Sequence, residues 1–257
     1  ESLEMTRFYV EPVCSPTRAS ILTGRYHMRT GVLATSRGGA RIFGDEETIA
    51  EVLAKSGYRT AIAGKWHLGD NAPSRPQDQG FQQVLVHRSG GIGQIPDRDA
   101  TYFRPVLWRN GRREVVDGYC TDLFFDAAID FIKKNRAHPF FLYLPTNVPH
   151  TPISIAQKYW KPFAEAGVPE KTAKLYGMMK NLDENFGRLT NTLAETGLAR
   201  NSVVIFMSDN GPTSGRFNSG LRGSKGSVYE GGIRVPFLVR WPQRISVGSR
   251  VDRLAAH

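Results

Sequence analysis

The sequence predicts an α/β fold, because short apolar runs of strand length alternate with longer amphipathic stretches of helical spacing. The runs that we expect to form strands are 7–10, 60–64, 140–144, 203–207 and 236–240. Two of them, 140–144 and 203–207, are apolar throughout and do not alternate. Continuous apolar runs are typical of central strands covered on both faces, so we expect a central, mostly parallel sheet flanked by helices on both faces.

Three stretches carry apolar residues at the spacing of one helix face, and we expect helices over 48–55, 121–134 and 170–196. Gly197 provides a stop for the longest of them. The stretches 69–118 and 210–232 are rich in Gly, Pro, Arg and Asn, and they predict long surface loops, which are often functional. We find no internal repeat and no linker, so the sequence predicts a single domain.

The composition excludes several classes of protein. Of 257 residues, 40% are hydrophobic and 23% are charged, which suits a globular chain with a sizeable core and not a disordered one. No apolar run approaches the ~20 residues that cross a bilayer, and two cysteines cannot build a disulfide scaffold. The net charge of +10 indicates an anionic partner, whether nucleic acid, acidic lipid or an acidic substrate.

Reactive side chains follow three of the predicted strands directly. Lys65 and His67 follow the strand at 60–64, and His150 follows the strand at 140–144. The pair Asp209-Asn210 follows the strand at 203–207. Because ligands of open α/β sheets bind outside the carboxyl ends of the strands, we expect these groups to converge on one pocket.

A short helix is predicted immediately after the first strand, with Ser15 as its N-cap, Pro16 at its first position and Gly24 as its stop. Cys14 would then lie at the mouth of the helix, where free N–H groups favour negative charge, and Arg18 is close enough to reach back toward it. A free cysteine by itself is more often a small buried apolar residue, so composition alone does not make Cys14 reactive.

The residues around Cys14 resemble the signature of the type I sulfatases, a family of the alkaline phosphatase superfamily. Four further segments resemble that family's motifs in the same order, so the resemblance extends along essentially the whole chain. The five segments are Cys14-Ser15-Pro16-Thr17-Arg18 with the following Ala19 to Arg25, Gly57 to Gly69 with Gly64-Lys65-Trp66-His67, Pro149-His150-Thr151-Pro152, Ser208-Asp209-Asn210-Gly211, and Gly223-Ser224-Lys225-Gly226 leading into Glu230 to Pro236.

The resemblance implies a sulfuric ester hydrolase with an alkaline-phosphatase-like fold. It implies that Cys14 is oxidised to formylglycine by a formylglycine-generating enzyme, and that the hydrated aldehyde is the nucleophile which forms a covalent sulfoenzyme. It further implies that the other catalytic residues hold the sulfate or move protons, and these residues are Arg18, Lys65, His67, His150 and Lys225. A lone lysine or histidine of this kind would otherwise be read as a surface or structural residue.

The resemblance also implies a divalent cation, Ca²⁺ or alternatively Mg²⁺, held by Asp209, Asn210 and the modified Cys14. By itself, Asp-Asn-Gly is a turn sequence. In the family, an aspartate pair from an upstream strand completes the metal site, and a C-terminal subdomain follows the region that ends here. We therefore expect residues 1–257 to be a sulfatase catalytic domain truncated at both ends.

Two other functions stay open. One is a phosphonate or phosphate ester hydrolase that uses the same modified cysteine, and the other is a non-catalytic homologue that binds sulfated glycans. The expected substrate is an aryl or carbohydrate sulfate, with no nucleic acid partner, because the basic residues are scattered and form no recognition motif. The resemblance implies a periplasmic, secreted or lysosomal location, and any signal is absent or already removed at Glu1. The Ser89-Gly90-Gly91 turn could line the substrate side of the pocket, and Cys120 is expected to be structural.

Overall fold

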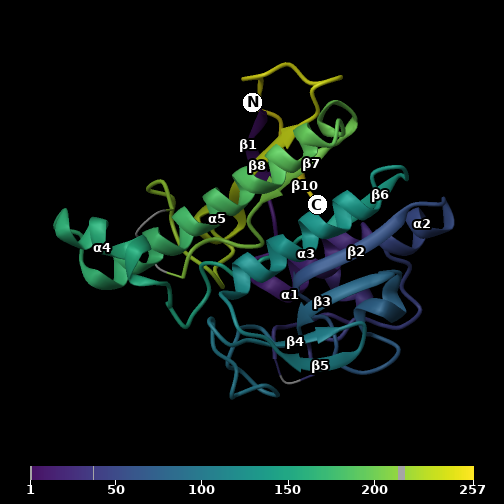
Figure 1. The fold of residues 1–257 in the computed structure, drawn as a ribbon, viewed down its shortest axis with the longest axis horizontal. Helices are drawn as coiled ribbons and strands as arrows, with labels where there is room; N and C mark the ends of the chain where they lie inside the picture. Colours follow the sequence, from purple (N-terminus) through teal and green to yellow (C-terminus); the bar gives the residue numbers. More distant parts are fainter. Residues whose placement is uncertain (1, 37, 214–217) are drawn as a thin grey trace. The chain divides into compact units, whose positions relative to one another are not determined.

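The computed structural model describes residues 2–36, 38–213 and 218–257, and the chain forms two compact units. The first unit comprises Glu1–Ile49 and Thr196–His257, and the second comprises Ala50–Glu195 (Figure 1). The second unit is therefore an insertion in the sequence of the first.

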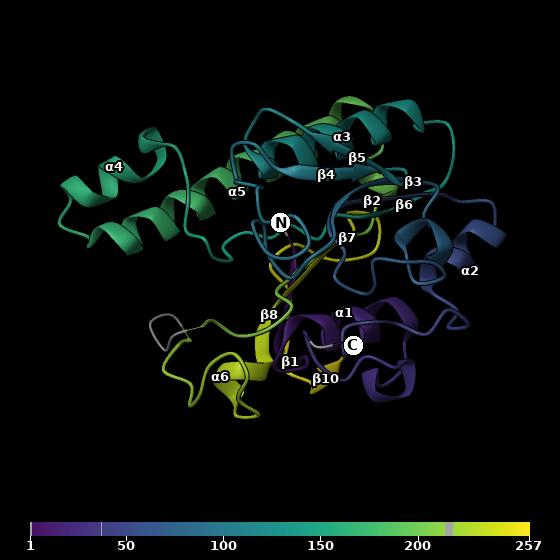
Figure 2. The ribbon, with the colours of Figure 1, turned by 90° about the horizontal axis from the view of Figure 1, so that it is seen from below.

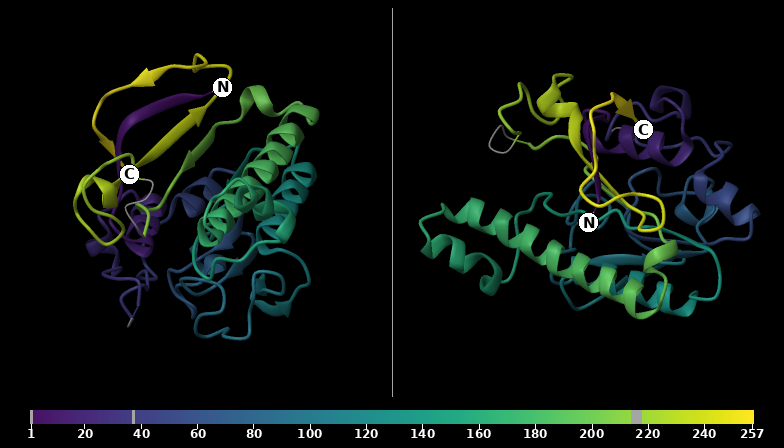
Figure 3. Two further views of the ribbon diagram at one scale, coloured as in Figure 1. Left: turned by 90° about the vertical axis from the view of Figure 1, so that its left-hand side faces the viewer. Right: turned by 90° about the horizontal axis from the view of Figure 1, so that it is seen from above.

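A five-stranded sheet forms the centre of the first unit, with β1, β8 and β7 running antiparallel in the order β1-β8-β7. The short strands β9 and β10 both run parallel to β1, and Figure 3 shows β1 beside β8. The ring of Phe8 stacks on that of Phe237 with centroids 4.0 Å apart, and Val10 and Val235 complete a small core. The elements of this unit are β1 (Leu3–Tyr9), α1 (Cys14–Thr23), η1 (His27–Thr30), η3 (Ala199–Asn201), β7 (Val204–Met207), α6 (Glu230–Ile233), β8 (Arg234–Arg240), β9 (Arg250–Val251) and β10 (Ala255–Ala256).

The second unit contains another five-stranded sheet, in the order β5-β4-β3-β2-β6. Strand β2 runs parallel to β3 and β6, whereas β4 and β5 are antiparallel to their neighbours. Helix α3 packs on β2, α5 packs on α3, and α4 lies against α5 (Figure 2). The elements are α2 (Ile49–Lys55), β2 (Arg59–Lys65), η2 (Pro76–Gln79), β3 (Gln83–His87), β4 (Val106–Arg109), β5 (Arg112–Val115), α3 (Cys120–Lys134), β6 (Phe140–Tyr143), α4 (Gln157–Glu165) and α5 (Glu170–Glu195).

The predicted α/β class is confirmed, and each predicted strand and helix is present with its ends shifted by only a few residues. The expected central, mostly parallel sheet is wrong in detail, because the described residues form two mixed sheets. Among these residues no helix is long and apolar enough to cross a membrane.

The long surface loop predicted over 69–118 is wrong, because this stretch contains η2 and the strands β3, β4 and β5. Strands β4 and β5 form a hairpin around Asn110 (φ 48°) and Gly111 (φ 84°). Two consecutive residues with positive φ make a type I′ turn, whose twist matches that of the strands, and Asn-Gly is its preferred sequence. The other predicted loop, 210–232, has no regular element in its described part before α6 begins at Glu230, while 214–217 lie outside the described residues.

The two wholly apolar strands do not lie at the centres of their sheets. Among the described residues, β6 ends one sheet and β7 ends the other. Ile205 and Phe206 of β7 are 56% and 37% exposed. Because successive side chains of a strand point to opposite faces, β7 is only partly covered on each face at these positions. The expectation of full coverage on both faces is therefore not met by this strand.

Candidate active site

Helix α1 presents Cys14 in its first turn. The helix begins at Cys14, with Val13 as an extended N-cap (φ −146°, ψ 159°), so the predicted cap Ser15 and the following Pro16 lie inside the first turn. Gly24 ends the helix with φ 65°, as expected. Cys14 forms no disulfide among the described residues and is only 3% exposed. The first N–H groups of a helix lack carbonyl partners within the helix, so the surroundings of Cys14 favour negative charge.

Arg18, one turn further along α1, binds Asp209. Its Nε and Nη2 atoms donate to Oδ2 of Asp209 at 3.1 and 2.9 Å. Arg18 is 4% exposed, so this ion pair is largely shielded from water. A buried guanidinium needs such a partner, because an unpaired charge inside a protein is costly. The pair thus ties the helix that carries Cys14 to the loop that follows β7.

Backbone hydrogen bonds hold the third segment of this unit in place. The N–H of Gly226 donates to the carbonyl of Pro12 at 2.8 Å, close to Cys14 in the sequence. The neighbouring Lys225 N–H donates to the carbonyl of Pro212 at 2.8 Å. The structure therefore brings the predicted residue Lys225 onto a loop bound to both of the other motif segments of its unit.

Asn210 offers an oxygen that suits a hard cation. Its Oδ1 atom is buried and has no hydrogen-bond partner among the described residues, while its Nδ2 atom donates to the carbonyl of Gly211 at 2.9 Å. The Asp209 carboxylate is adjacent in sequence, and carboxylate and amide oxygens are ligands preferred by Ca²⁺ and Mg²⁺. The donor set therefore fits the predicted cation, although no cluster of three or more His, Cys, Asp or Glu side chains that could hold a metal occurs among the described residues.

In the second unit, β2 ends on the predicted residues Lys65 and His67. Lys65 is 2% exposed, and its N–H donates to the carbonyl of Pro145 at 2.7 Å. Gly64 has φ 138°, and a Cβ there would collide with the same carbonyl, so only glycine fits. His67 has φ 59°, a left-handed conformation that is uncommon for a residue with a side chain and is found preferentially at functional positions.

His150 lies in the turn that follows β6. Its N–H donates to the carbonyl of Asn147 at 2.8 Å, and its own carbonyl accepts from the hydroxyl of Tyr102 at 2.6 Å. The ring atom Nδ1 lies 2.7 Å from the carbonyl of Thr151. Because a carbonyl only accepts, this contact places a proton on Nδ1. Nε2 is then the ring atom whose proton depends on the charge state of the histidine.

A glycine turn lies close to both histidine rings, and sequence reasoning did not identify its role fully. A Cβ on Gly90 would lie 2.8 Å from Cε1 of His67, and a Cβ on Gly91 would lie 2.8 Å from Nδ1 of His150. The same two positions would approach the amide of Gln94 within 3.1 and 3.2 Å. The expectation that this turn lines the site stays a prediction, but the structure places it against both predicted histidines. No sequence signal identified Gln94.

Cys120 differs from Cys14 in its surroundings. It is fully buried in the core of the second unit, and its thiol lies 3.6 Å from Oδ1 of Asn147. Burial, the largest cause, raises the pKa of the Cys120 thiol to about 12. A thiol with so high a pKa is a poor nucleophile at neutral pH, which agrees with the structural role expected for it.

The structure divides the predicted site residues between the two units. In the first unit it joins Arg18 to Asp209 directly, and in the second it places the rings of His67 and His150 next to adjacent glycines of one turn. The residues of the first unit are Cys14, Arg18, Asp209, Asn210 and Lys225, and those of the second are Lys65, His67 and His150.

A model of the sulfatase family matches residues 1–257, and the chain belongs to this family. Human N-acetylgalactosamine-6-sulfatase is 31% identical over 286 residues, which cover 100% of this chain and 53% of the relative. Human arylsulfatase A is 32% identical over 294 residues, which cover 96% of this chain and 53% of that relative. The chain thus spans about half the length of these curated relatives.

Solved structures support the predicted fold. The structure of Ps i-CgsB in complex with k-i-k-neocarrahexaose is 30% identical, with a TM-score of 0.89, and covers 99% of this chain and 61% of that chain. The phosphonate monoester hydrolase of Agrobacterium radiobacter is 17% identical, with a TM-score of 0.67. The match covers 99% of this chain and 64% of the hydrolase chain. The latter likeness concerns the fold alone, and it is consistent with the alkaline-phosphatase-like architecture predicted from the sequence.

Proposed function

We propose that this chain forms the catalytic part of a sulfuric ester hydrolase that cleaves sulfate monoesters. The observation that carries the proposal is the buried Cys14 in the first turn of α1, one helical turn before an Arg18 bound to Asp209. A helix N-terminus and a guanidinium together suit a tetrahedral anion. The family supplies the reaction, in which Cys14 is converted to formylglycine by a formylglycine-generating enzyme.

The proposed reaction has two stages. One hydroxyl of the hydrated aldehyde at position 14 loses its proton and attacks the sulfur of the ester, the S–O bond to the alcohol breaks, and the alcohol leaves after accepting a proton. The second hydroxyl then loses its proton, the C–O bond to the sulfate breaks, and the aldehyde re-forms as free sulfate departs. Water hydrates the aldehyde for the next cycle. An unmodified thiol or a serine has no second hydroxyl and cannot complete this second stage.

The charged residues have separate tasks in this proposal. Arg18, Lys65 and Lys225 neutralise the sulfate oxygens, where charge gathers as the S–O bond breaks. His67 takes the proton of the second hydroxyl during elimination of sulfate. His150 and Lys225 protonate the leaving alcohol. For His150 the proposal is supported by the proton fixed on Nδ1, because a protonated Nε2 then makes the ring a cation that can donate.

Asp209 and Asn210 are the residues of this chain that would hold the divalent cation, together with the modified residue at position 14. The buried Oδ1 of Asn210, which has no hydrogen-bond partner within residues 2–36, 38–213 and 218–257, supports this assignment. Bound Ca²⁺ or Mg²⁺ would supply positive charge that stabilises the hydrated aldehyde and the sulfate oxygens. Arg18 then has a second task, because its two hydrogen bonds orient the Asp209 carboxylate.

The substrate class is a sulfated small molecule or carbohydrate, and no nucleic acid partner is proposed. Relatives named N-acetylgalactosamine-6-sulfatase, and a structural neighbour solved in complex with k-i-k-neocarrahexaose, support a carbohydrate sulfate. The proposed location is periplasmic, secreted or lysosomal, as expected for the family.

The test is mass spectrometry and kinetics on the full-length protein, produced together with a formylglycine-generating enzyme. We expect the peptide that contains Cys14 to carry the aldehyde, and Cys14→Ala to abolish release of sulfate from an aryl sulfate. Retained turnover in Cys14→Ala would refute the proposal. An aryl phosphate assayed in parallel separates a sulfatase from a phosphate ester hydrolase, and binding of a sulfated glycan without turnover would indicate a non-catalytic homologue.

A further inference from the structure

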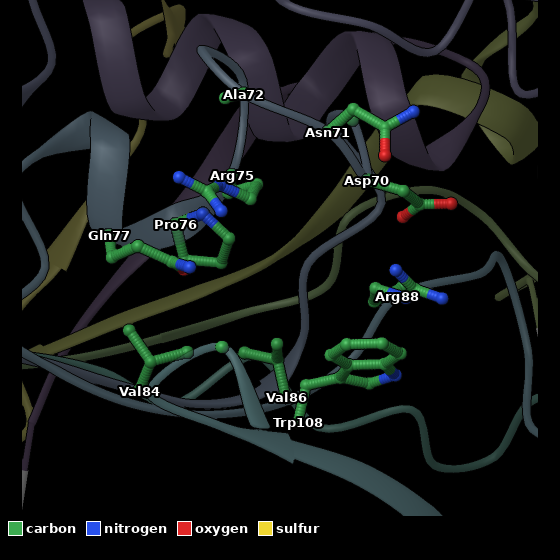
Figure 4. Close-up of a pocket in the computed structure, with 12 residues that line it drawn as sticks. Asp70, Asn71, Ala72, Arg75, Pro76, Gln77, Val84, Val86, Arg88 and Trp108 are labelled. Atoms are coloured by element: carbon green, nitrogen blue, oxygen red, sulfur yellow. The ribbon is translucent and has the colours of Figure 1, made fainter. Parts of the chain in front are cut away.

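The second unit contains a cavity of about 290 Å³, lined by both polar and apolar side chains, that none of the proposed catalytic residues lines. Its walls are the loop that follows β2, the strand β3 and the β4–β5 hairpin (Figure 4). Small-molecule sites measure ~300–1,000 Å³, so this cavity suits one ring-sized group. The lining side chains that carry a charge or a hydrogen-bonding group include Asp70, Asn71, Arg75, Gln77, Arg88 and Trp108.

Arg88 is positioned for a ligand by the indole of Trp108. Its guanidinium carbon lies 3.6 Å from the centroid of the Trp108 ring, and the Trp108 Nε1 atom is itself fixed by a 3.2 Å hydrogen bond to Asp97. Such stacking holds the planar guanidinium in one orientation. The Nε atom of Arg88 is nevertheless buried without a hydrogen-bond partner among the described residues. Because that atom is closed off from solvent, a ligand in the cavity can accept only from the other nitrogens of the guanidinium.

The charges of the cavity favour an uncharged ligand. Figure 4 shows the Asp70 carboxylate on the same side of the cavity as the Arg88 guanidinium. The other cation, Arg75, is neutralised by Asp78 through two hydrogen bonds of 2.8 Å. One guanidinium and one carboxylate therefore face the cavity, and an anionic ligand would meet the Asp70 charge.

The chemistry of these walls matches hydroxyl groups. Each hydroxyl both donates and accepts, so neighbouring hydroxyls can donate to the Asp70 carboxylate and accept from Arg88. The amides of Asn71 and Gln77 can do either, and both line the same cavity. Burial raises the pKa of the Asp70 carboxyl, while the charge of Arg88 acts in the opposite direction.

The cavity adjoins the segment that carries His67. The N–H of His67 donates to the carbonyl of Arg88 at 3.2 Å. Asp70 is three residues after His67, so their Cα atoms are at most ~11 Å apart. A group bound in the cavity would therefore contact the same loop that carries His67, to which the proposed function assigns a catalytic task.

We propose that this cavity is a subsite for an unsulfated sugar ring that belongs to the same oligosaccharide as the sulfated ring. The proposal rests on the proposed function and narrows its substrate class to carbohydrate sulfates. Asp70 and Arg88 are its specificity-determining residues. Recognition of a neighbouring ring would let the protein distinguish an oligosaccharide from a simple aryl sulfate.

The first test measures binding without turnover. N-acetylgalactosamine and neocarrahexaose freed of its sulfate groups are titrated into the full-length protein, and heat release and the indole N–H signal of Trp108 are recorded. We expect saturable binding of at least one of these probes, weakened about ten-fold or more in Asp70→Ala and Arg88→Met, which is what loss of ~1.4 kcal/mol produces. The matched controls Asp99→Asn and Arg112→Met alter exposed residues outside the cavity and should bind as the parent does.

The second test compares rates. In Asp70→Ala we expect the ratio of kcat/KM for sulfated neocarrahexaose to that for an aryl sulfate to fall about ten-fold, mainly through KM. If neither neutral probe binds, or if Asp70→Ala and Arg88→Met bind both as the parent does, the subsite is refuted. If only sulfated probes bind and Arg88→Met abolishes that binding, the cavity holds an anion and the neutral assignment is wrong. Failure of the proposed function would instead appear as absent turnover, with the binding result unchanged.

Discussion

A single methyl group at Gly90 should displace a proposed catalytic ring without unfolding the protein. In Gly90→Ala the new Cβ would lie 2.8 Å from Cε1 of His67, whereas ordinary contact begins at 3.4 Å. The ring must therefore move by about 0.6 Å, the difference between these distances. Since a misplacement of ~1 Å costs on the order of 100-fold in rate, we expect kcat to fall about ten-fold. Gly90 does not have a positive φ, so alanine adds no backbone strain there.

The assay is sulfate release from an aryl sulfate by the full-length protein, combined with NMR of the His67 imidazole. Gly187→Ala is the matched control, because its Cβ would have nothing within 4 Å. Gly91→Ala provides a parallel test on the ring of His150, whose Nδ1 would lie 2.8 Å from the new Cβ. If Gly90→Ala left both kcat and the His67 resonances unchanged, the turn would not be what holds this ring.

Three further predictions concern stability and reactivity. Tyr102→Phe removes the 2.6 Å hydrogen bond to the carbonyl of His150, so it should lower the free energy of unfolding by about 1–3 kcal/mol. Urea denaturation measures this, and an unchanged urea concentration at the midpoint of unfolding would contradict it. Gly187→Ala should raise that free energy by about 0.5–1 kcal/mol through helix propensity, whereas Gly177→Ala should lower it, because its Cβ would lie 3.1 Å from the backbone of α4. With a thiol pKa of about 12, Cys120 should resist iodoacetamide at pH 8 in the folded protein and react once urea unfolds it; rapid labelling without denaturant would argue against its burial.

Local sequence patterns were sufficient to predict most elements. Apolar runs and helical spacing located β1, β2, β6, β7 and β8 and the helices α2, α3 and α5, because those signals reside in adjacent residues. The β4–β5 hairpin was missed although Asn110-Gly111 is a strong turn signal, since the many Gly, Pro and Arg residues around it indicated a loop. The apolar run 84–86, which forms the middle of β3 in the same stretch, was overlooked for the same reason.

The sequence identified the residues of the candidate site but not the contacts between them. Motif spacing identified Arg18 and Asp209, yet only tertiary structure reveals that one binds the other, because 191 positions separate them in the chain. The contact of Gly91 with His150 was equally inaccessible, since glycine leaves no pattern that identifies its neighbour. The Arg88–Trp108 stack depends on the pairing of β3 with β4, and sequence reasoning had assigned both strands to a loop.

Among the described residues, no strand pairs with the outer edge of β7, and this affects how the chain behaves at high concentration. An edge strand with exposed apolar side chains is a template for another strand, and neighbouring molecules supply one. The exposed apolar side chains are Ile205 on one face of β7, at 56% exposure, and Phe206 on the other. Preparations of these 257 residues alone should therefore self-associate as their concentration rises. The substitution Ile205→Lys would place a charge on this exposed strand and should reduce self-association, and it alters none of the proposed catalytic residues.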